Sequence, residues 1–184
     1  MKNINSKAKE VIQFWFEELE PQQWFVKDEA LDKKIHDKFS AILNQAAQAE
    51  LFKWRKTPHG RLAEIIVLDQ FSRNIFRDTE KSFAQDPLAL ALAQEAVALG
   101  ADQALSKTER SFMYMPYMHS ESSAIHEEAL VLFQQLANPD TLDYEYKHKA
   151  IIDRFGRYPH RNEILGRVSN AEELTFLSEP GSGF

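Results

Sequence analysis

The sequence contains no cysteine. This absence excludes disulfide bonds, thiolate zinc sites, iron–sulfur clusters and cysteine nucleophiles. The chain also lacks any run of about 18 apolar residues, and residues 1–10 have no uninterrupted apolar segment of the kind found in signal peptides. We therefore expect a cytoplasmic protein without a membrane partner. Only six glycines occur, and the glycine-rich motifs of nucleotide-binding loops and hydrolase elbows are missing.

Positive charge is in deficit, with 22 basic residues against 28 acidic ones and a net charge of -6. An acidic chain of this kind repels nucleic acid, so we predict no nucleic-acid partner. His119, His148 and His160 lack the helical spacing of paired metal ligands, and nearby arginines repel cations. We predict no metal and no cofactor.

What is present is the composition of an ordinary globular chain, with 43% hydrophobic, 11% aromatic and 27% charged residues among 184. No linker rich in proline, glycine or serine divides the middle of the chain, and no fixed repeat is found. We predict one domain over residues 1–178. Pro180, Gly181 and Gly183 predict a frayed tail over residues 179–184.

Alanine and leucine number 38 together, against 11 for valine plus threonine, which favours an all-α fold. Apolar spacing, caps and breakers predict about eight helices, at residues 11–19, 31–46, 57–76, 86–100, 106–116, 121–136 and 142–155, and after the capping box 169–172. Pro116 is expected to kink or end its helix. Short connections predict antiparallel neighbours, arranged as stacked helical hairpins or an irregular bundle. We expect these aromatic residues in the core: Phe14, Trp15, Phe16, Trp24 and Phe25.

The segment 68–77 carries a polar stripe on a largely apolar helix. Asp69, Arg73 and Arg77 are spaced four residues apart and share one face, with Gln70 and Asn74 beside them. One interpretation is a structural ion network in which Asp69 and Glu64 balance the arginines. The other is a site for an anion, which arginine binds with two parallel hydrogen bonds.

The segment 115–121 places His119 and Glu121 just after Pro116. An imidazole is the side chain best suited to proton transfer near neutral pH, so His119 could act as acid or base with Glu121 orienting it. Alternatively, His119 satisfies buried backbone and Glu121 favours the start of the next helix. His126 is expected at the surface.

A third segment, residues 154–167, concentrates arginines around a turn marked by Gly156 and Pro159. Its candidate ligand residues are Arg154, Arg157, Arg161 and Asn162, and His160 is a further candidate for acid–base catalysis. These cations need counter-charges, either from a bound anion or from carboxylates such as Asp69, Glu121, Asp153 and Glu163. Both interpretations stay open at this point.

Together these blocks resemble the bacterial domain-of-unknown-function family 924. The resemblance covers nearly the whole chain, and the segments that carry it are 14–16, 24–25, 68–74, 83–86, 115–121, 154–162 and 165–167. It implies an all-helical fold similar to tetratricopeptide-like superhelices of helical hairpins. It implies no activity, substrate or catalytic residue.

Our hypothesis is that the basic segments and the His119 bend meet in one pocket that binds a small anionic ligand bearing phosphate or carboxylate. The predicted ligand-binding residues are Asp69, Arg73, Asn74, Arg77, Arg154, Arg157, Arg161 and Asn162, and acid–base chemistry would fall to His119, Glu121 or His160. The first alternative is a helical-hairpin protein-interaction scaffold that recognises an acidic peptide or a C-terminal carboxylate. The second is a purely structural ion network. The sequence does not determine the oligomeric state.

Overall fold

The structure, a computed structural model, describes residues 4–183, and within that range all regular structure is helical. The all-α prediction is confirmed. The α-helices are α1 (Ser6–Gln13), α2 (Glu29–Ala47), α3 (Pro58–Ile66), α4 (Ser72–Ile75), α5 (Asp86–Ala98), α6 (Lys107–Met118), α7 (Ser123–Leu136), α8 (Pro139–Phe155) and α9 (Ala171–Leu177). The π-helical turn Val67–Phe71 joins α3 and α4 without a break. The nine α-helices within residues 4–183 therefore form eight continuous helical segments.

Local signals in the sequence set several helix ends. The hydroxyl of Thr57 accepts a hydrogen bond from the Gly60 amide at the start of α3, and Ser106 with Glu109 forms a capping box at the start of α6. Gly100 adopts φ 67°, a left-handed conformation that ends the α5 segment. The last capping box lies one residue later than expected, because Asn170 and not Ser169 caps α9.

Pro116 does not end α6, contrary to one of our expectations. The helix continues past it to Met118. Helices α7 and α8 begin at Ser123 and Pro139, two residues after and three residues before the predicted starts. In α8 the earlier start follows from Asn138, whose side chain accepts hydrogen bonds from two amides of the first turn.

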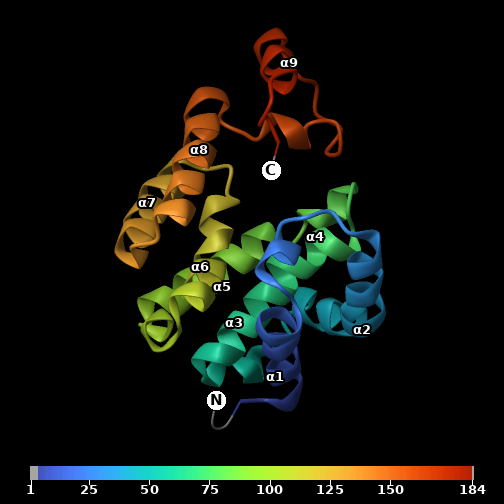
Figure 1. The fold of residues 1–184 in the computed structure, drawn as a ribbon, viewed down its shortest axis with the longest axis vertical. Helices are drawn as coiled ribbons and strands as arrows, with labels where there is room; N and C mark the ends of the chain where they lie inside the picture. Colours follow the sequence, from blue (N-terminus) through green and yellow to red (C-terminus); the bar gives the residue numbers. More distant parts are fainter. Residues whose placement is uncertain (1–3, 184) are drawn as a thin grey trace.

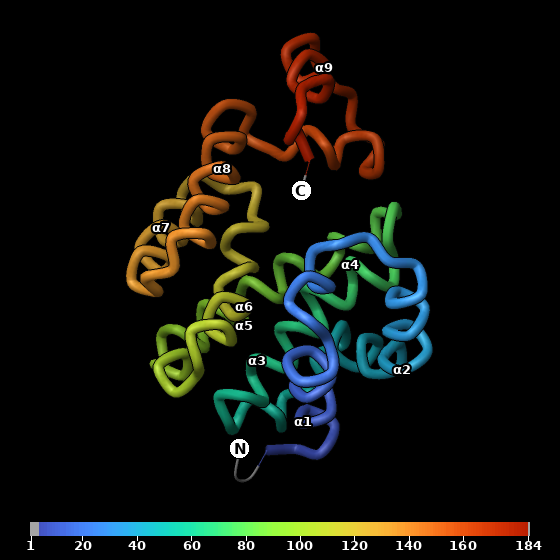
Figure 2. Tube along the Cα trace, in the orientation of Figure 1, coloured from blue at the N-terminus to red at the C-terminus, as the bar shows by residue number. Residues whose placement is uncertain are grey.

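The helices pack in groups around one main core (Figures 1 and 2). Helices α1 to α4 lie together, α5 and α6 follow them, and α7 and α8 form a hairpin against α6. The largest buried side chains of this core include Trp15, Tyr114, Phe39 and Phe71. Phe14 and Trp15 are buried as expected, but Phe25 is 70% exposed because it lies in the loop before α2. The tetratricopeptide-like stacking stays a prediction.

Residues 156–183, which we call the C-terminal segment, attach to the rest of the molecule at the end of α8 (Figure 1). Tyr158 packs there with Ile151 and Ile152 in a second, smaller core. Further contacts to α5 and α6 are polar and form the site described below. In the tail, Ser182 donates a hydrogen bond to the Leu177 carbonyl, and Phe184 lies outside the described residues. The single-domain boundary and the frayed tail stay predictions.

No helix within residues 4–183 has both the length and the apolar character needed to cross a membrane.

Candidate functional site

Asp69 lies in the fully buried π-helical turn that joins α3 to α4. Such turns add one residue to a helix and frequently occur at functional sites. The Asp69 carboxylate receives hydrogen bonds from neighbours on two helices: Gln70 Nε2 is 2.5 Å from Oδ2, and His119 Nδ1, at the end of α6, is 2.7 Å from Oδ1. Arg73 Nη1 is 3.1 Å from the same Oδ1. The turn therefore joins the first two segments that the sequence singled out.

Electrostatics fix the protonation of the Asp69–His119 pair. Burial opposes ionisation of Asp69, but its interactions with His119 and Arg73 outweigh this effect and hold the carboxyl pKa below its ordinary value. Burial, followed by the Arg73 charge, lowers the pKa of His119 although Asp69 opposes this. At neutral pH His119 is therefore neutral, its Nδ1–H donates to the Asp69 carboxylate, and Nε2 carries a lone pair. Nε2 has no hydrogen-bond partner within residues 4–183.

Asp86 connects the third segment to this pair. Arg73 binds the Asp86 carboxylate through both terminal nitrogens, at 2.8 and 3.0 Å, and Arg161 Nη1 from the C-terminal segment is 3.3 Å from Oδ2. Asp86 is the first residue of α5, directly after Gln85. Its carboxylate is shared between two guanidinium groups. The two basic segments are thus adjacent in space.

Arg161 is buried, and its positive charge is only partly balanced by a carboxylate. Its guanidinium lies between the rings of Phe83 and Tyr158, 4.6 and 4.5 Å from their centroids, and Nη2 donates to the His119 carbonyl at 3.1 Å. Nε has no partner among the described residues. Burial and then the neighbouring Arg73 lower the pKa of Arg161, although Asp86 opposes them. Because Asp86 is already bound by Arg73, Arg161 has only part of a counter-charge.

We call Asp69, Arg73, Asp86, His119 and Arg161 the Asp69–His119 cluster. It is largely shielded but reaches the surface, since the side chains of Arg73, His119 and Asp86 are 20%, 16% and 14% exposed. These three groups therefore form the solvent-facing rim of the cluster, while Asp69 is held inside at 1%.

Glu121 does not orient His119, so that expectation is wrong. Its carboxylate binds Arg167 at 2.6 and 2.9 Å and accepts a hydrogen bond from the Tyr158 amide at 2.8 Å. The physical reason is the end of α6 at Met118, after which the chain turns and directs Glu121 toward the C-terminal segment. The partner of His119 is Asp69, 50 positions earlier.

The other predicted ligand residues bind groups of the protein itself. Arg77 and Asn74 both bind Asp32 of α2, so Asp69 does not fix Arg77, because the stripe ends with α4 at Ile75. Glu64 binds Arg55 instead of the stripe.

On the C-terminal segment, Arg157 Nε and Nη2 donate hydrogen bonds to the Glu173 carboxylate at 2.6 and 2.8 Å. These bonds lower the pKa of that carboxyl to about 2. Arg154 binds the exposed Glu172, while Asn162 bonds Ser169 and Arg167. The role of these residues in ligand binding stays a prediction.

His160 lies beside Tyr158, with ring centroids 5.5 Å apart. Burial, followed by the charge of Arg161, lowers its pKa to about 4, so it is neutral at physiological pH. Its predicted part in catalysis is untested.

The prediction that His126 lies at the surface is wrong. Its side chain is fully buried and its Nδ1 is 2.7 Å from Glu145 Oε1. The signal was present in the helical spacing, because His126 shares the buried face of α7 with Ala129, Phe133 and Leu136.

The comparisons with known proteins agree with this fold. A family model described as "Bacterial protein of unknown function (DUF924)" matches residues 11–181. The chain belongs to this family. One solved structure, titled "Structure of Protein of Unknown Function ATU0120 from Agrobacterium tumefaciens", is 41% identical in sequence with a TM-score of 0.89, covering 93% of this chain and 96% of that one. The search of curated proteins gives no match.

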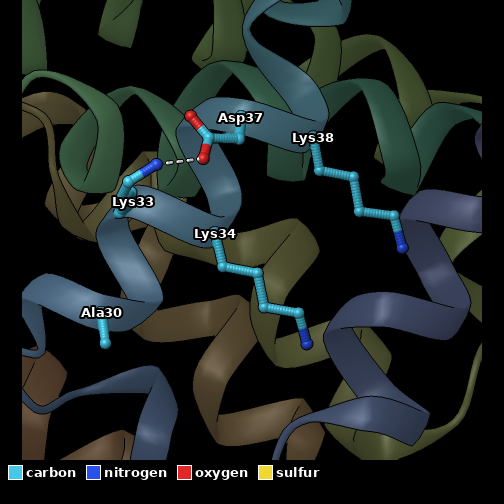
Figure 3. Close-up of a pocket in the computed structure, with 5 residues that line it drawn as sticks. All are labelled: Ala30, Lys33, Lys34, Asp37 and Lys38. Atoms are coloured by element: carbon cyan, nitrogen blue, oxygen red, sulfur yellow. Dashed lines mark hydrogen bonds and ion pairs between the residues drawn. The ribbon is translucent and has the colours of Figure 1, made fainter.

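A separate depression on this DUF924 protein lies along α2 (Figure 3). It has a volume of about 520 Å³ and is lined by Ala30, Lys33, Lys34, Asp37 and Lys38. Lys33 pairs with Asp37 (Figure 3). Lys34 and Lys38 lie 3.5 and 3.6 Å from the two carboxylate oxygens of Glu18. These exposed lysines are thus balanced by acidic neighbours, and none of the predicted site residues lines the depression.

Within residues 4–183 no three histidine, aspartate or glutamate side chains form a group that could hold a metal ion.

Proposed function

We propose that this DUF924 protein binds a small anion at the Asp69–His119 cluster and that His119 transfers a proton to or from the bound molecule. The observation that carries the proposal is the state of His119. Its Nδ1 is fixed 2.7 Å from a buried carboxylate, while Nε2 has no partner among the described residues and the side chain is 16% exposed. A neutral imidazole oriented by a carboxylate is the arrangement of a general base.

Two arginines supply the attraction for an anion. Arg73 forms part of the rim. Among residues 4–183, Arg161 Nε has no partner, and the one carboxylate that pairs with Arg161 is shared with Arg73. A further anionic oxygen would stabilise a buried guanidinium that lacks a full counter-charge, because charge-assisted hydrogen bonds are stronger in a site shielded from water. An arriving anion is expected to move Arg161 partly away from Asp86, which is held at 3.3 Å and is its weaker contact.

The charge of the cluster favours a singly charged ligand. Arg73 and Arg161 are balanced by Asp69 and Asp86, so the cluster is neutral overall while His119 is neutral. A carboxylate adds one negative charge, whereas a phosphate dianion adds two beside two existing carboxylates. We therefore propose a small carboxylate as the ligand class.

The test is a binding series with acetate, succinate, inorganic phosphate and sulfate, followed by thermal unfolding and by the ¹⁵N resonances of His119. An anion at 100 times its dissociation constant stabilises the fold by about 2.7 kcal/mol. We expect acetate, which carries a single charge, to raise the melting temperature more than the dianions succinate, phosphate and sulfate do, and to shift the His119 resonances. Arg161→Gln should remove both effects.

The matched control is Arg154→Gln on the same segment, whose side chain is 46% exposed and paired with an exposed glutamate. It should bind the anions as the wild type does. If no anion changes the wild type, and Arg161→Gln merely unfolds at a much lower temperature than Arg154→Gln, then the cluster is a structural ion network and the proposal is wrong.

A further inference from the structure

His126 of α7 and Glu145 of α8 form an ion-pair contact inside the protein, away from solvent. Both side chains are 0% exposed, and Nδ1 is 2.7 Å from Oε1. Neither residue belongs to the Asp69–His119 cluster. Two ionisable groups in a fully buried position are costly to the fold unless their protons are arranged to match each other.

The second ring nitrogen determines one of these protons. His126 Nε2 is 2.9 Å from the Ser120 carbonyl oxygen, which can only accept a hydrogen bond. The Tyr158 hydroxyl, 3.2 Å from the same nitrogen, gives its own proton to the Met118 carbonyl at 2.5 Å. Both neighbours therefore act as acceptors toward Nε2, which must carry a hydrogen.

With Nε2 protonated, the contact at Nδ1 needs a second proton. It lies either on Nδ1, opposite a carboxylate, or on the Glu145 carboxyl, which then donates to Nδ1. In both cases the pair has no net charge. The other carboxyl oxygen, Oε2, is buried without a partner among the described residues, and burial raises the pKa of Glu145 although His126 and Lys149 oppose it. Both observations favour the arrangement with the proton on the carboxyl.

We propose that the His126–Glu145 pair keeps this shared proton at pH values where an exposed histidine and glutamate have lost it, and that it thereby acts as a pH-sensitive latch on residues 118–121. The inference goes beyond the proposed function and does not depend on it. Losing the proton would set the Nδ1 lone pair against a carboxylate oxygen at 2.7 Å inside the core.

The latch acts on the end of α6, where the last carbonyl groups of a helix lack partners within it. Side chains supply the missing donors to three consecutive carbonyls. Tyr158 Oη donates to Met118, Arg161 Nη2 to His119, and His126 Nε2 to Ser120. If the imidazole turns away from an ionised Glu145, the Ser120 carbonyl loses its donor. Residues 118–121 and the C-terminal segment that binds them should then loosen together.

The titratable groups around the pair keep their charge between pH 7 and 10. Burial lowers the pKa of His148 to about 3 and that of His160 to about 4, and burial likewise lowers the pKa of His119. Burial raises the pKa of Tyr158, and the hydrogen bond to Asp153 raises the pKa of Lys149. In this window the shared proton is therefore the local group that changes.

The number of protons bound in the folded and unfolded states determines how stability changes with pH. Above the ordinary histidine pKa of about 6.5 the unfolded chain has lost a proton that the folded pair retains. The stabilisation that the pair contributes is therefore fully present below about pH 6.5. It is lost as the pH rises through the pKa of the shared proton in the folded protein. One retained proton makes the unfolding equilibrium constant rise about tenfold for each pH unit.

The experiment is urea unfolding of the full chain from pH 6 to 10 for the wild type and Glu145→Gln. A glutamine amide donates to Nδ1 as the protonated carboxyl does, but it has no proton to lose. The wild-type unfolding constant should rise about tenfold per pH unit relative to that of Glu145→Gln. Glu127→Gln, a neighbour of His126 that pairs with Lys149 at the surface, should follow the wild type. Equal pH slopes for the wild type and Glu145→Gln would overturn the proposal.

NMR on the wild type decides the question if Glu145→Gln does not fold. The ¹⁵N shifts of His126 and the side-chain ¹³C shift of Glu145 report both protonation states at pH 8. We expect a ring with hydrogen on Nε2 and a protonated carboxyl, and an imidazolium facing a carboxylate would also retain the proton. A neutral ring beside an ionised Glu145 at pH 8 contradicts the proposal.

Discussion

At the scale of single residues, Asp69 organises the site because its carboxylate binds groups from three side chains. Gln70 and His119 form hydrogen bonds with it, and Arg73 forms an ion pair with it at 3.1 Å. It also sets the tautomer of His119, since an ionised carboxylate accepts the Nδ1 hydrogen and leaves the lone pair on Nε2. Removing its charge therefore tests the geometry of the cluster independently of any ligand.

Asp69→Asn should lower the pKa of His119 further, because burial and Arg73 keep lowering it while the charge that opposes them is gone. Stability should fall by about 1–3 kcal/mol, the range for losing hydrogen bonds to a charged group. NMR titration of His119 and urea unfolding measure the two effects. Asp32→Asn, which removes the partner of Arg77, serves as the control. A His119 titration that responds equally to both variants would show that Asp69 has no specific role.

At the scale of elements, α3 and α4 position the site because the π-helical turn between them places Asp69 inside and Arg73 toward Asp86. Close packing of the backbone fixes the position of the first turn of α3. A Cβ atom at Gly60 would lie 2.0 Å from the Trp54 carbonyl oxygen, which belongs to backbone and cannot turn aside. Glycine is thus required here for close approach of two chain segments.

Gly60→Ala should destabilise the protein by about 1–3 kcal/mol, since the overlap forces a backbone shift at the start of α3. A lower urea midpoint with an unchanged slope would measure this. Gly100→Ala provides a contrast, because an added Cβ there meets nothing within 4 Å and the cost comes from φ 67° alone. A Gly60→Ala variant as stable as the wild type would show that the α3 start relaxes freely.

At the scale of the whole molecule, polar contacts hold the C-terminal segment across the end of α6. Glu121 accepts hydrogen bonds from Arg167 and from the Tyr158 amide. Arg161 contributes contacts to Asp86 and to the His119 carbonyl. The segment thus completes the cluster, and its attachment decides whether Arg161 lies beside His119.

Glu121→Gln should loosen this attachment, with about 1–3 kcal/mol lost from the charge-assisted bonds to Arg167. Hydrogen exchange should accelerate in residues 156–183 and stay slow in α1 to α3. Glu172→Gln removes the exposed partner of Arg154 and should change little, as expected for a surface ion pair. Uniform acceleration along the chain after Glu121→Gln would mean that the segment does not open separately.

The pH response of this attachment has two directions. Burial opposes ionisation of Glu121, but the hydrogen bonds from Arg167 and Tyr158 lower its pKa below the ordinary value. Stability from a lowered carboxyl pKa is present above the unfolded value of about 4.3 and is lost as the pH falls through the folded value. The His126–Glu145 pair weakens the same region at alkaline pH instead.

The sequence alone determined the helical class and many helix ends, because these depend on neighbours within a few residues. The capping box at Ser106 and the glycine stop at Gly100 are examples. It also identified Asp69, Arg73, His119 and Arg161 as candidates by their chemistry and local density.

The tertiary structure decided which charged groups pair. Asp69 meets His119 across 50 positions, Asp86 meets Arg161 across 75, and His126 is buried against Glu145. Long charged side chains can reach several partners at similar cost, so the choice among them follows from where the packed helices and the end of α6 place each backbone. Helix formation is a local property of the chain, whereas the composition of the site follows from its three-dimensional packing.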